Sequence, residues 1–213
     1  MSKTNAAAEK VLTFKPTAAL TRCVWRVAAM STPFDATSAA LDHFALFGLP
    51  QRYAIDQRAL EQSYRDVQTK VHPDRFAQAS AAEQRVSLQW ATRANEAYQT
   101  LRDPLQRARH LLELRGVDCG LETNTAMPAD FLMQQMQWRE ALEEACDDRD
   151  LAALEQLAQE LAQQTSARLQ HLAQHLDGVR DDLAAAGELR CLIFMQKFSL
   201  AIDDAREGIE GHA

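Results

Sequence analysis

The sequence predicts an all-α protein built from two helical units. Only 7 Gly and 6 Pro occur in 213 residues, whereas Ala, Leu, Gln, Glu and Arg abound, and these lose least free energy on entering a helix. Apolar residues recur every three or four positions through most of the chain, as in amphipathic helices. The length allows one ordinary domain or two small ones, each with its own core, and we expect two.

Composition and charge exclude several classes of protein. Hydrophobic residues make up 46% and charged residues 25% of the chain, the proportions of a soluble globular protein. A formal charge of -7 argues against nucleic-acid binding, although a local basic patch stays open. No apolar run approaches the roughly 20 residues that cross a bilayer, so we expect no membrane segment.

The four cysteines point to a reducing compartment. They lie far apart, with no C-x-x-C pair and no secretory leader before them. We therefore expect reduced thiols in a cytoplasmic protein. The cysteines are Cys23, Cys119, Cys146 and Cys191.

Residues 1–38 lack sustained apolar periodicity and are basic, with Glu9 as their one acid before Asp35. We expect a disordered N-terminal extension, or an upstream start codon with the working start at Met30. A basic, acid-poor leader also fits an organellar transit peptide, which stays open as the alternative.

Four helices are expected within residues 39–116. A short apolar helix from about Leu41 stops at Gly48-Leu49-Pro50. Asp56 is the expected N-cap of a second helix, whose buried face recurs at intervals of four, three and four residues from Leu60 to Val71. Pro73 then prevents continuation of that helix.

A turn is expected over residues 72–80. Ser80 and Glu83 form a capping box that opens the third helix. Asp103-Pro104 caps and opens a fourth helix, which ends at Gly116.

The C-terminal part is expected to be an antiparallel bundle. Residues 117–127 form a polar linker, and three helices follow within 128–213, at about 128–146, 149–176 and 179–209. In the last helix the expected apolar face consists of Val179, Leu183, Leu189, Leu192, Phe198 and Ile202.

The tripeptide His72-Pro73-Asp74 stands between two amphipathic helices. Pro and Asp are common in turns, so three residues alone indicate only a helix stop. The surrounding order is more informative: a short helix, a helix with a partly basic face, the tripeptide, a capped helix, and Asn95-Glu96-Ala97-Tyr98 near its end.

From Leu41 to about Leu114 this arrangement resembles a J domain, which stimulates ATP hydrolysis by chaperones of the heat-shock protein 70 class. The resemblance implies that the tripeptide and the exposed face of the preceding helix dock on the chaperone. Arg75 stands where J domains often have Lys, and the charge is kept. The implied chaperone-binding residues are His72, Pro73, Asp74, Arg58, Arg65 and Lys70.

We expect no enzyme and no bound cofactor. The sequence has no evident set of nucleophile, base and oxyanion donors, and no phosphate loop of the G-x-x-x-x-G-K-[ST] kind. The ATP should therefore belong to the partner.

The first helix after the linker has two apolar faces. Phe131, Trp138, Leu142 and Ala145 share one face. Leu132, Met133 and Met136 lie on another, in line with Glu140 and Glu144. The pattern alone leaves two interpretations open: packing against the J domain or a neighbouring helix, or an apolar protein-binding surface edged by acids.

A J domain, a short linker and a three-helix tail with Phe131-Leu132-Met133 and Arg139-Glu140 together resemble the HscB family of iron-sulfur cluster co-chaperones, over about residues 41–210. The resemblance implies that the tail binds a scaffold protein of the IscU type and that the J domain presents it to the chaperone HscA. Gln137 stands where the family can carry Glu, which removes one charge. The implied scaffold-binding residues are Leu132, Met133, Met136, Glu140, Glu144 and Phe194.

Other interpretations carry less weight. His171 and His175 have the i, i+4 spacing of a shared metal site, but no third ligand is evident and we expect a solvated face. Three of the cysteines could meet and hold a cluster, although a lone helical Cys is more often a small apolar filler. A J-domain co-chaperone for another client, and an iron-sulfur or metal protein in its own right, stay open as alternatives.

Overall fold

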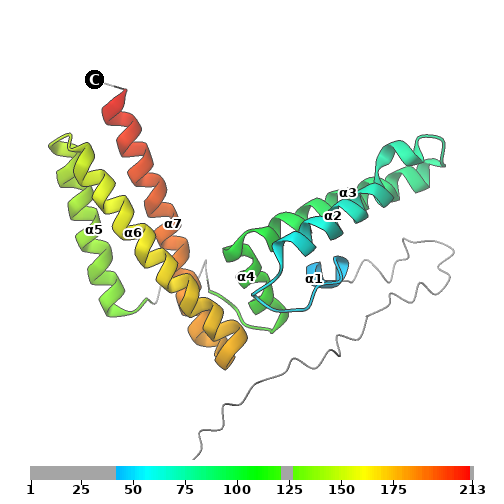
Figure 1. Cartoon of the computed structure of the whole chain (residues 1–213), viewed down its shortest axis with the longest axis horizontal. Coiled ribbons are helices and arrows are strands. Elements are labelled where there is room, and N and C mark those ends of the chain that lie inside the picture. Colours follow the sequence, from blue (N-terminus) through cyan, green and yellow to red (C-terminus); the bar gives the residue numbers. More distant parts are fainter. Residues whose placement is uncertain (1–41, 121–126, 212–213) are drawn as a thin grey trace, which may run out of the picture. The chain divides into compact units, whose positions relative to one another are not determined.

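The computed structural model describes residues 42–120 and 127–211, and Figure 1 shows their arrangement. No strand occurs in these residues, so the predicted all-α fold is confirmed. None of the described helices combines the length and apolarity that crossing a membrane requires. The helices are α1 (His43–Leu46), α2 (Gln57–Val71), α3 (Ala81–Arg102), α4 (Pro104–Leu114), α5 (Ala129–Asp147), α6 (Leu151–Ala173) and α7 (Asp182–Glu210).

The expected extension over 1–38 lies outside the described residues, as do Leu41 and residues 121–126 of the expected linker. The division of the chain at residues 117–127 therefore stays a prediction.

Side-chain caps start three of these helices where the sequence indicates. Asp56 accepts the backbone N–H groups of Arg58 and Ala59. Ser80 and Glu83 each accept the other's backbone N–H, which completes the predicted capping box of α3. Asp103 caps α4, with Pro104 in its first turn. Each cap satisfies donors that the first helical turn leaves without partners.

Glycine and proline residues mark the ends of α1, α2 and α4. Gly48 has φ 65° and Gly116 has φ 76°, a left-handed backbone that glycine adopts without strain. The second helix stops at Val71, before His72-Pro73, and a short 3-10 turn over Pro73–Phe76 follows.

The first hydrophobic core lies among α1 to α4 and also takes in apolar residues from the end of α6 to the first half of α7. Asp177 joins the same two parts of the chain, because its carboxylate accepts the backbone N–H groups of Tyr53 (2.8 Å) and Ala54 (2.7 Å). Core members from the C-terminal helices are Leu172, Leu176, Ala185, Ala186, Leu189 and Leu192.

The second core lies among α5, α6 and α7. Trp138 is 2% exposed, stacks on Phe198 with ring centroids 5.9 Å apart, and donates its indole N–H to Glu160 (3.2 Å). Phe131 meets the Trp138 ring edge-on at 6.0 Å. These contacts fix which face of α5 is buried. The other buried members are Ala145, Leu154, Leu157, Leu161, Cys191, Met195 and Ile202.

The start of the last helix differs from the prediction. A π-helical segment, Gln174–Val179, continues α6, and Arg180 then takes a left-handed conformation (φ 55°). Asp181 caps α7, which begins at Asp182 instead of near 179. The prediction that Val179 and Leu183 join the buried face is wrong: they are 67% and 78% exposed.

Candidate partner-binding sites

The tripeptide lies at the surface where α2 ends. The His72 side chain is 53% exposed and the Asp74 side chain is 89% exposed. His72 Nδ1 accepts the backbone N–H of Asp74 at 3.3 Å, so a neutral ring carries its proton on Nε2. This local bond shapes the turn, and Asp74 Oδ2 lies 3.6 Å from His72 Nδ1 in a side chain that is otherwise open to solvent.

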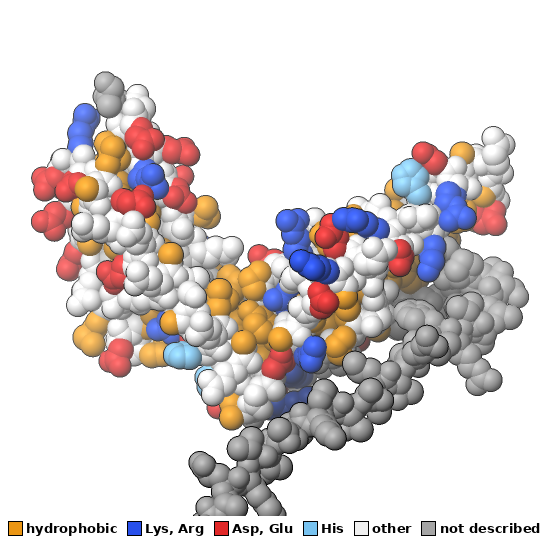
Figure 2. All heavy atoms as spheres, viewed as in Figure 1, with side chains coloured by type: hydrophobic (Ala, Val, Ile, Leu, Met, Phe, Trp, Pro, Cys, Tyr) orange, Lys and Arg blue, Asp and Glu red, His pale blue; other side chains and the backbone are white. Residues whose placement is uncertain are grey.

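The three basic residues predicted on α2 are all exposed. Arg65 pairs with Glu61 one turn earlier, whereas Arg58 and Lys70 form no ion pair with any side chain of the described residues. On the face seen in Figure 2, Lys and Arg side chains alternate with Asp and Glu over α2 and α3. The surface is therefore mixed in charge, as the sequence indicates.

Asn95 and Tyr98 connect α3 to α2 behind this surface. Asn95 Oδ1 accepts hydrogen bonds from the Tyr64 hydroxyl (2.7 Å) and from Gln68 Nε2 (2.6 Å). The Tyr64 and Tyr98 rings stack with centroids 4.1 Å apart. Two residues of the Asn95-Glu96-Ala97-Tyr98 motif thus hold the helix that carries the basic side chains.

Ser87 holds the end of α2, and the sequence analysis missed it. This buried residue of α3 donates its hydroxyl hydrogen to the carbonyl oxygen of Val71 at 2.7 Å. The carbonyls at a helix end lack intrahelical partners, so a buried hydroxyl there satisfies a group that would otherwise be costly to bury. The sequence did offer a signal for this residue, because Ser87 is a hydroxyl residue between the apolar Val86 and Leu88 of α3.

The second apolar face of α5 is exposed in the described part of the chain. Leu132 is 45% exposed, Met133 58% and Met136 62%. Glu140 and Glu144 continue the line, are exposed, and form no ion pair with the described residues. In the described residues this face is therefore not packed against a neighbouring helix, and the interpretation as an exposed binding surface remains.

Phe194 of α7 lies beside α5 and is half-buried. Its ring meets Phe131 edge-on at 5.8 Å and stacks on Phe198 at 6.1 Å. The guanidinium carbon of Arg139 lies 5.9 Å from the centre of the same ring. The packing of α7 on α5 thus brings Phe194 to the helix that carries the other predicted scaffold-binding residues.

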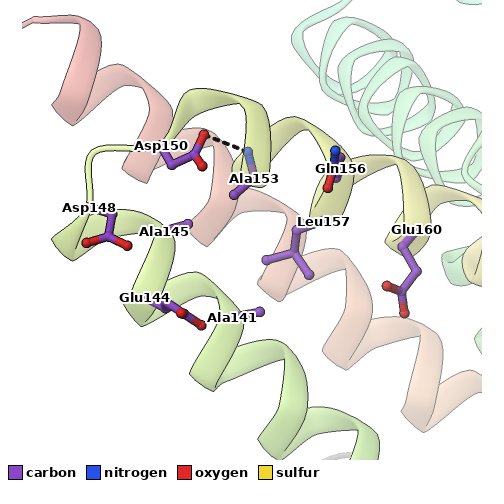
Figure 3. Close-up of a pocket in the computed structure, with 9 residues that line it drawn as sticks. All are labelled: Ala141, Glu144, Ala145, Asp148, Asp150, Ala153, Gln156, Leu157 and Glu160. Carbon is purple, nitrogen blue, oxygen red and sulfur yellow. Dashed lines mark hydrogen bonds between the residues drawn. The ribbon is translucent and has the colours of Figure 1, made fainter.

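The acidic end of α5 borders a hollow of about 320 Å³ between α5 and α6. Figure 3 shows Glu144 and Asp148 on the α5 side and Glu160 on the α6 side. Asp150 caps α6 by accepting the backbone N–H groups of Ala152 and Ala153. Acidic side chains therefore continue from Glu144 around the turn between the two helices.

The residues considered for metal binding do not assemble into a site in the described part of the chain. No group of three His, Cys, Asp or Glu side chains suited to a metal ion occurs there. Cys119 belongs to the first core and Cys191 to the second, and burial raises the pKa of both thiols. His171 is exposed on α6.

Comparison with known proteins identifies the family. The model of the HSCB C-terminal oligomerisation domain matches residues 127–203. The co-chaperone protein HscB homolog of Burkholderia multivorans is 52% identical over 168 residues, which cover 79% of this chain and 95% of that protein. The chain belongs to the HscB family of co-chaperones. A second HscB homolog, from Ralstonia nicotianae, is 56% identical over 160 residues, which cover 75% of this chain and 91% of that protein.

Solved HscB structures have the same fold. Chaperone HscB from Vibrio cholerae aligns with a TM-score of 0.69 at 34% identity, over 79% of this chain and 99% of its own. Human co-chaperone protein HscB aligns with a TM-score of 0.73 over 83% of this chain and 91% of its own. At 24% identity the human protein supports the fold alone. The arrangement of a J domain and a C-terminal helical bundle is therefore that of the HscB family.

Proposed function

We propose that this HscB family member is a co-chaperone of iron-sulfur cluster assembly. In this proposal a surface on α5 and α7 binds the cluster scaffold protein, of the IscU type. The His72-Pro73-Asp74 loop engages a heat-shock protein 70 class chaperone of the HscA type and stimulates its ATP hydrolysis. The observation that carries the proposal is the exposed line of Leu132, Met133 and Met136, which runs into two acids that no described residue pairs with.

The chemistry of the α5 surface suits a protein partner. Methionine side chains are flexible and polarizable, so they adapt to a partner's apolar groups. Exposed apolar residues rimmed by charges are typical of binding surfaces. No cation among the described residues forms an ion pair with Glu140 or Glu144, so they favour a partner segment that carries Lys or Arg and speed its approach.

The chemistry of the tripeptide suits docking on the chaperone. An exposed carboxylate such as that of Asp74 can accept two parallel hydrogen bonds from an arginine. The positive charges of Arg58 and Lys70 steer the loop towards an acidic partner surface, with a rate that falls as salt screens the charges. The ATP belongs to the chaperone in this mechanism.

Holding both partners at once couples their activities. Once the scaffold is bound, its encounter with the chaperone becomes intramolecular, and the effective concentration of the client rises without any new contact. The coupling is reciprocal, so a chaperone that is bound through the tripeptide also favours the scaffold complex.

Scaffold binding tests the α5 surface. Truncating the two exposed methionines in the Met133→Ala/Met136→Ala variant should weaken the Kd for the scaffold by roughly ten- to a hundredfold, since anchors at an interface centre carry most of its energy. Isothermal titration calorimetry with the purified scaffold measures this change.

A matched control is Leu200→Ala, which truncates an α7 side chain that is 60% exposed and lies outside the proposed site. Its Kd should equal that of the wild type. If the double variant also binds as tightly as the wild type, the α5 surface is not the scaffold site. If the wild type does not bind the scaffold at all, the client is a different protein.

A further inference from the structure

Arg75, directly after the tripeptide, connects the loop to the helix before it. Its backbone N–H donates to the carbonyl oxygen of His72 at 3.1 Å. Its side chain turns back, and Nη1 donates to the carbonyl oxygen of Thr69 at 2.9 Å. Arg75, which follows the His72-Pro73 step, thus bonds to two carbonyl oxygens that precede Pro73.

The position of the guanidinium follows from helix electrostatics. Thr69 is in the last turn of α2, where carbonyl oxygens have no intrahelical donor. The C-terminal end of a helix carries a partial negative charge, which a cation stabilises. A guanidinium has several donors in a rigid plane, so it can bond to one carbonyl in a fixed direction, unlike the ammonium of Lys.

Other bonds hold the two flanks of the loop from α3. Ser87 donates to the Val71 carbonyl at 2.7 Å on the α2 side. Gln84 donates to the carbonyl oxygens of Ala77 (3.3 Å) and Ala79 (3.1 Å) on the other side. Against these fixed flanks, the Arg75 side chain restrains the segment that contains Asp74.

We infer that Arg75 is a positioning residue for the His72-Pro73-Asp74 loop and not itself a contact to the chaperone. Its guanidinium bonds to Thr69 and keeps the turn in the conformation that exposes Asp74. The link to chaperone stimulation rests on the proposed function, whereas the restraint on the loop does not depend on it.

Amide hydrogen exchange of the full chain tests the restraint without a partner. In Arg75→Met the side-chain donors are removed, and the amides of Arg75 and Ala77, which bond within the turn, should exchange roughly three- to tenfold faster, the effect expected for one lost hydrogen bond. Arg75→Lys should give an intermediate rate. Arg102→Met removes an exposed cation from the end of α3 and should leave these two amides unchanged.

The ATPase of the HscA-type chaperone, measured below saturation with the same variants, tests the consequence. Stimulation should fall in the order wild type, Arg75→Lys, Arg75→Met, in proportion to the gain in exchange rate. The salt dependence of the half-maximal concentration should change no more than in Arg102→Met. Lys70→Met, by contrast, should flatten that salt dependence.

Two results would overturn the inference. The first is unchanged amide exchange in Arg75→Met. The second is full stimulation by Arg75→Lys together with a flattened salt dependence in Arg75→Met, which would make Arg75 a docking charge. If the wild type does not stimulate the chaperone, the proposed function fails, and the exchange rates alone decide whether Arg75 restrains the loop.

Discussion

His43 of α1 and His110 of α4 stack on each other with ring centroids 4.1 Å apart. Neither His43 Nδ1 nor His110 Nε2, both buried, has a hydrogen-bond partner among the described residues. Burial lowers the pKa of both side chains from 6.5 and is the largest cause for each, while Glu113 and Asp42 act in the opposite direction at His110. The pair is therefore stable as two neutral rings.

This stacking predicts a pH-dependent stability. A lowered pKa means that the folded chain binds fewer protons than the unfolded chain, so the free energy of unfolding falls as the pH drops below about 6.5 and this contribution is flat above it. His110→Gln removes one of the two groups, so its stability should fall less steeply over that range. Urea unfolding of both proteins between about pH 5.5 and 7.5 measures the two slopes. Equal slopes would mean that the pair does not control this dependence.

At the α5 surface, the sequence identifies the residues but not their exposure. A helical period places Leu132, Met133 and Met136 on one side of α5 and Phe131 and Trp138 on another. It does not say which side a neighbour covers, because an apolar stripe is equally suited to packing and to binding. The decision lies in tertiary structure, where α6 and α7 cover only the Phe131 and Trp138 side.

Among the elements, helix starts are the best-predicted feature, because caps depend on neighbouring residues alone. Asp56, Ser80 and Asp103 each cap the helix that the sequence assigns to them. The start of α7 also has a local cap, Asp181, but it was mispredicted because the π-helical continuation of α6 to Val179 was not foreseen. Asp177, in the π-helical segment before α7, bonds to the backbone of Tyr53 and Ala54, more than 120 positions away, and no local pattern encodes that bond.

The capping box of α3 predicts the effect of one substitution. Ser80→Ala removes the side-chain oxygen that accepts the Glu83 backbone N–H, and the free energy of unfolding should fall by about 1 kcal/mol, the usual value for a lost N-cap. Urea denaturation measures the change.

Ser166→Ala is the control, because Ser166 is an exposed residue in the interior of α6 and alanine is the better helix former there. This control should be neutral or slightly stabilising. A loss in Ser80→Ala no larger than in Ser166→Ala would contradict the role of the cap.

For the whole molecule, the sequence predicts the helices but not which of them share a core. Leu176 and Leu189 fit the helical period of the C-terminal part, yet they pack in the core of α1 to α4. Arg115, just after α4, adds an ion pair with Asp182 of α7 (2.5 Å) and a hydrogen bond to the Leu176 carbonyl (3.1 Å). An apolar stripe does not specify its partner, so these contacts between segments far apart in the sequence could not be predicted from periodicity.

The central proposal is that one chain couples a scaffold to a chaperone. A coupled mechanism requires the two proposed sites to be separable by mutation. Asp74 is highly exposed, and so are Met133 and Met136. Substitutions there should leave the cores intact, which unfolding in urea can verify for each variant.

The most direct test is the steady-state ATPase of the HscA-type chaperone with and without the scaffold. The wild type should stimulate hydrolysis in both conditions, and more with the scaffold. Asp74→Asn should stimulate in neither. Met133→Ala/Met136→Ala should keep the scaffold-independent part and lose most of the scaffold-dependent increase. Equal stimulation by the wild type and Asp74→Asn would contradict the role of the tripeptide and, with it, the coupling mechanism.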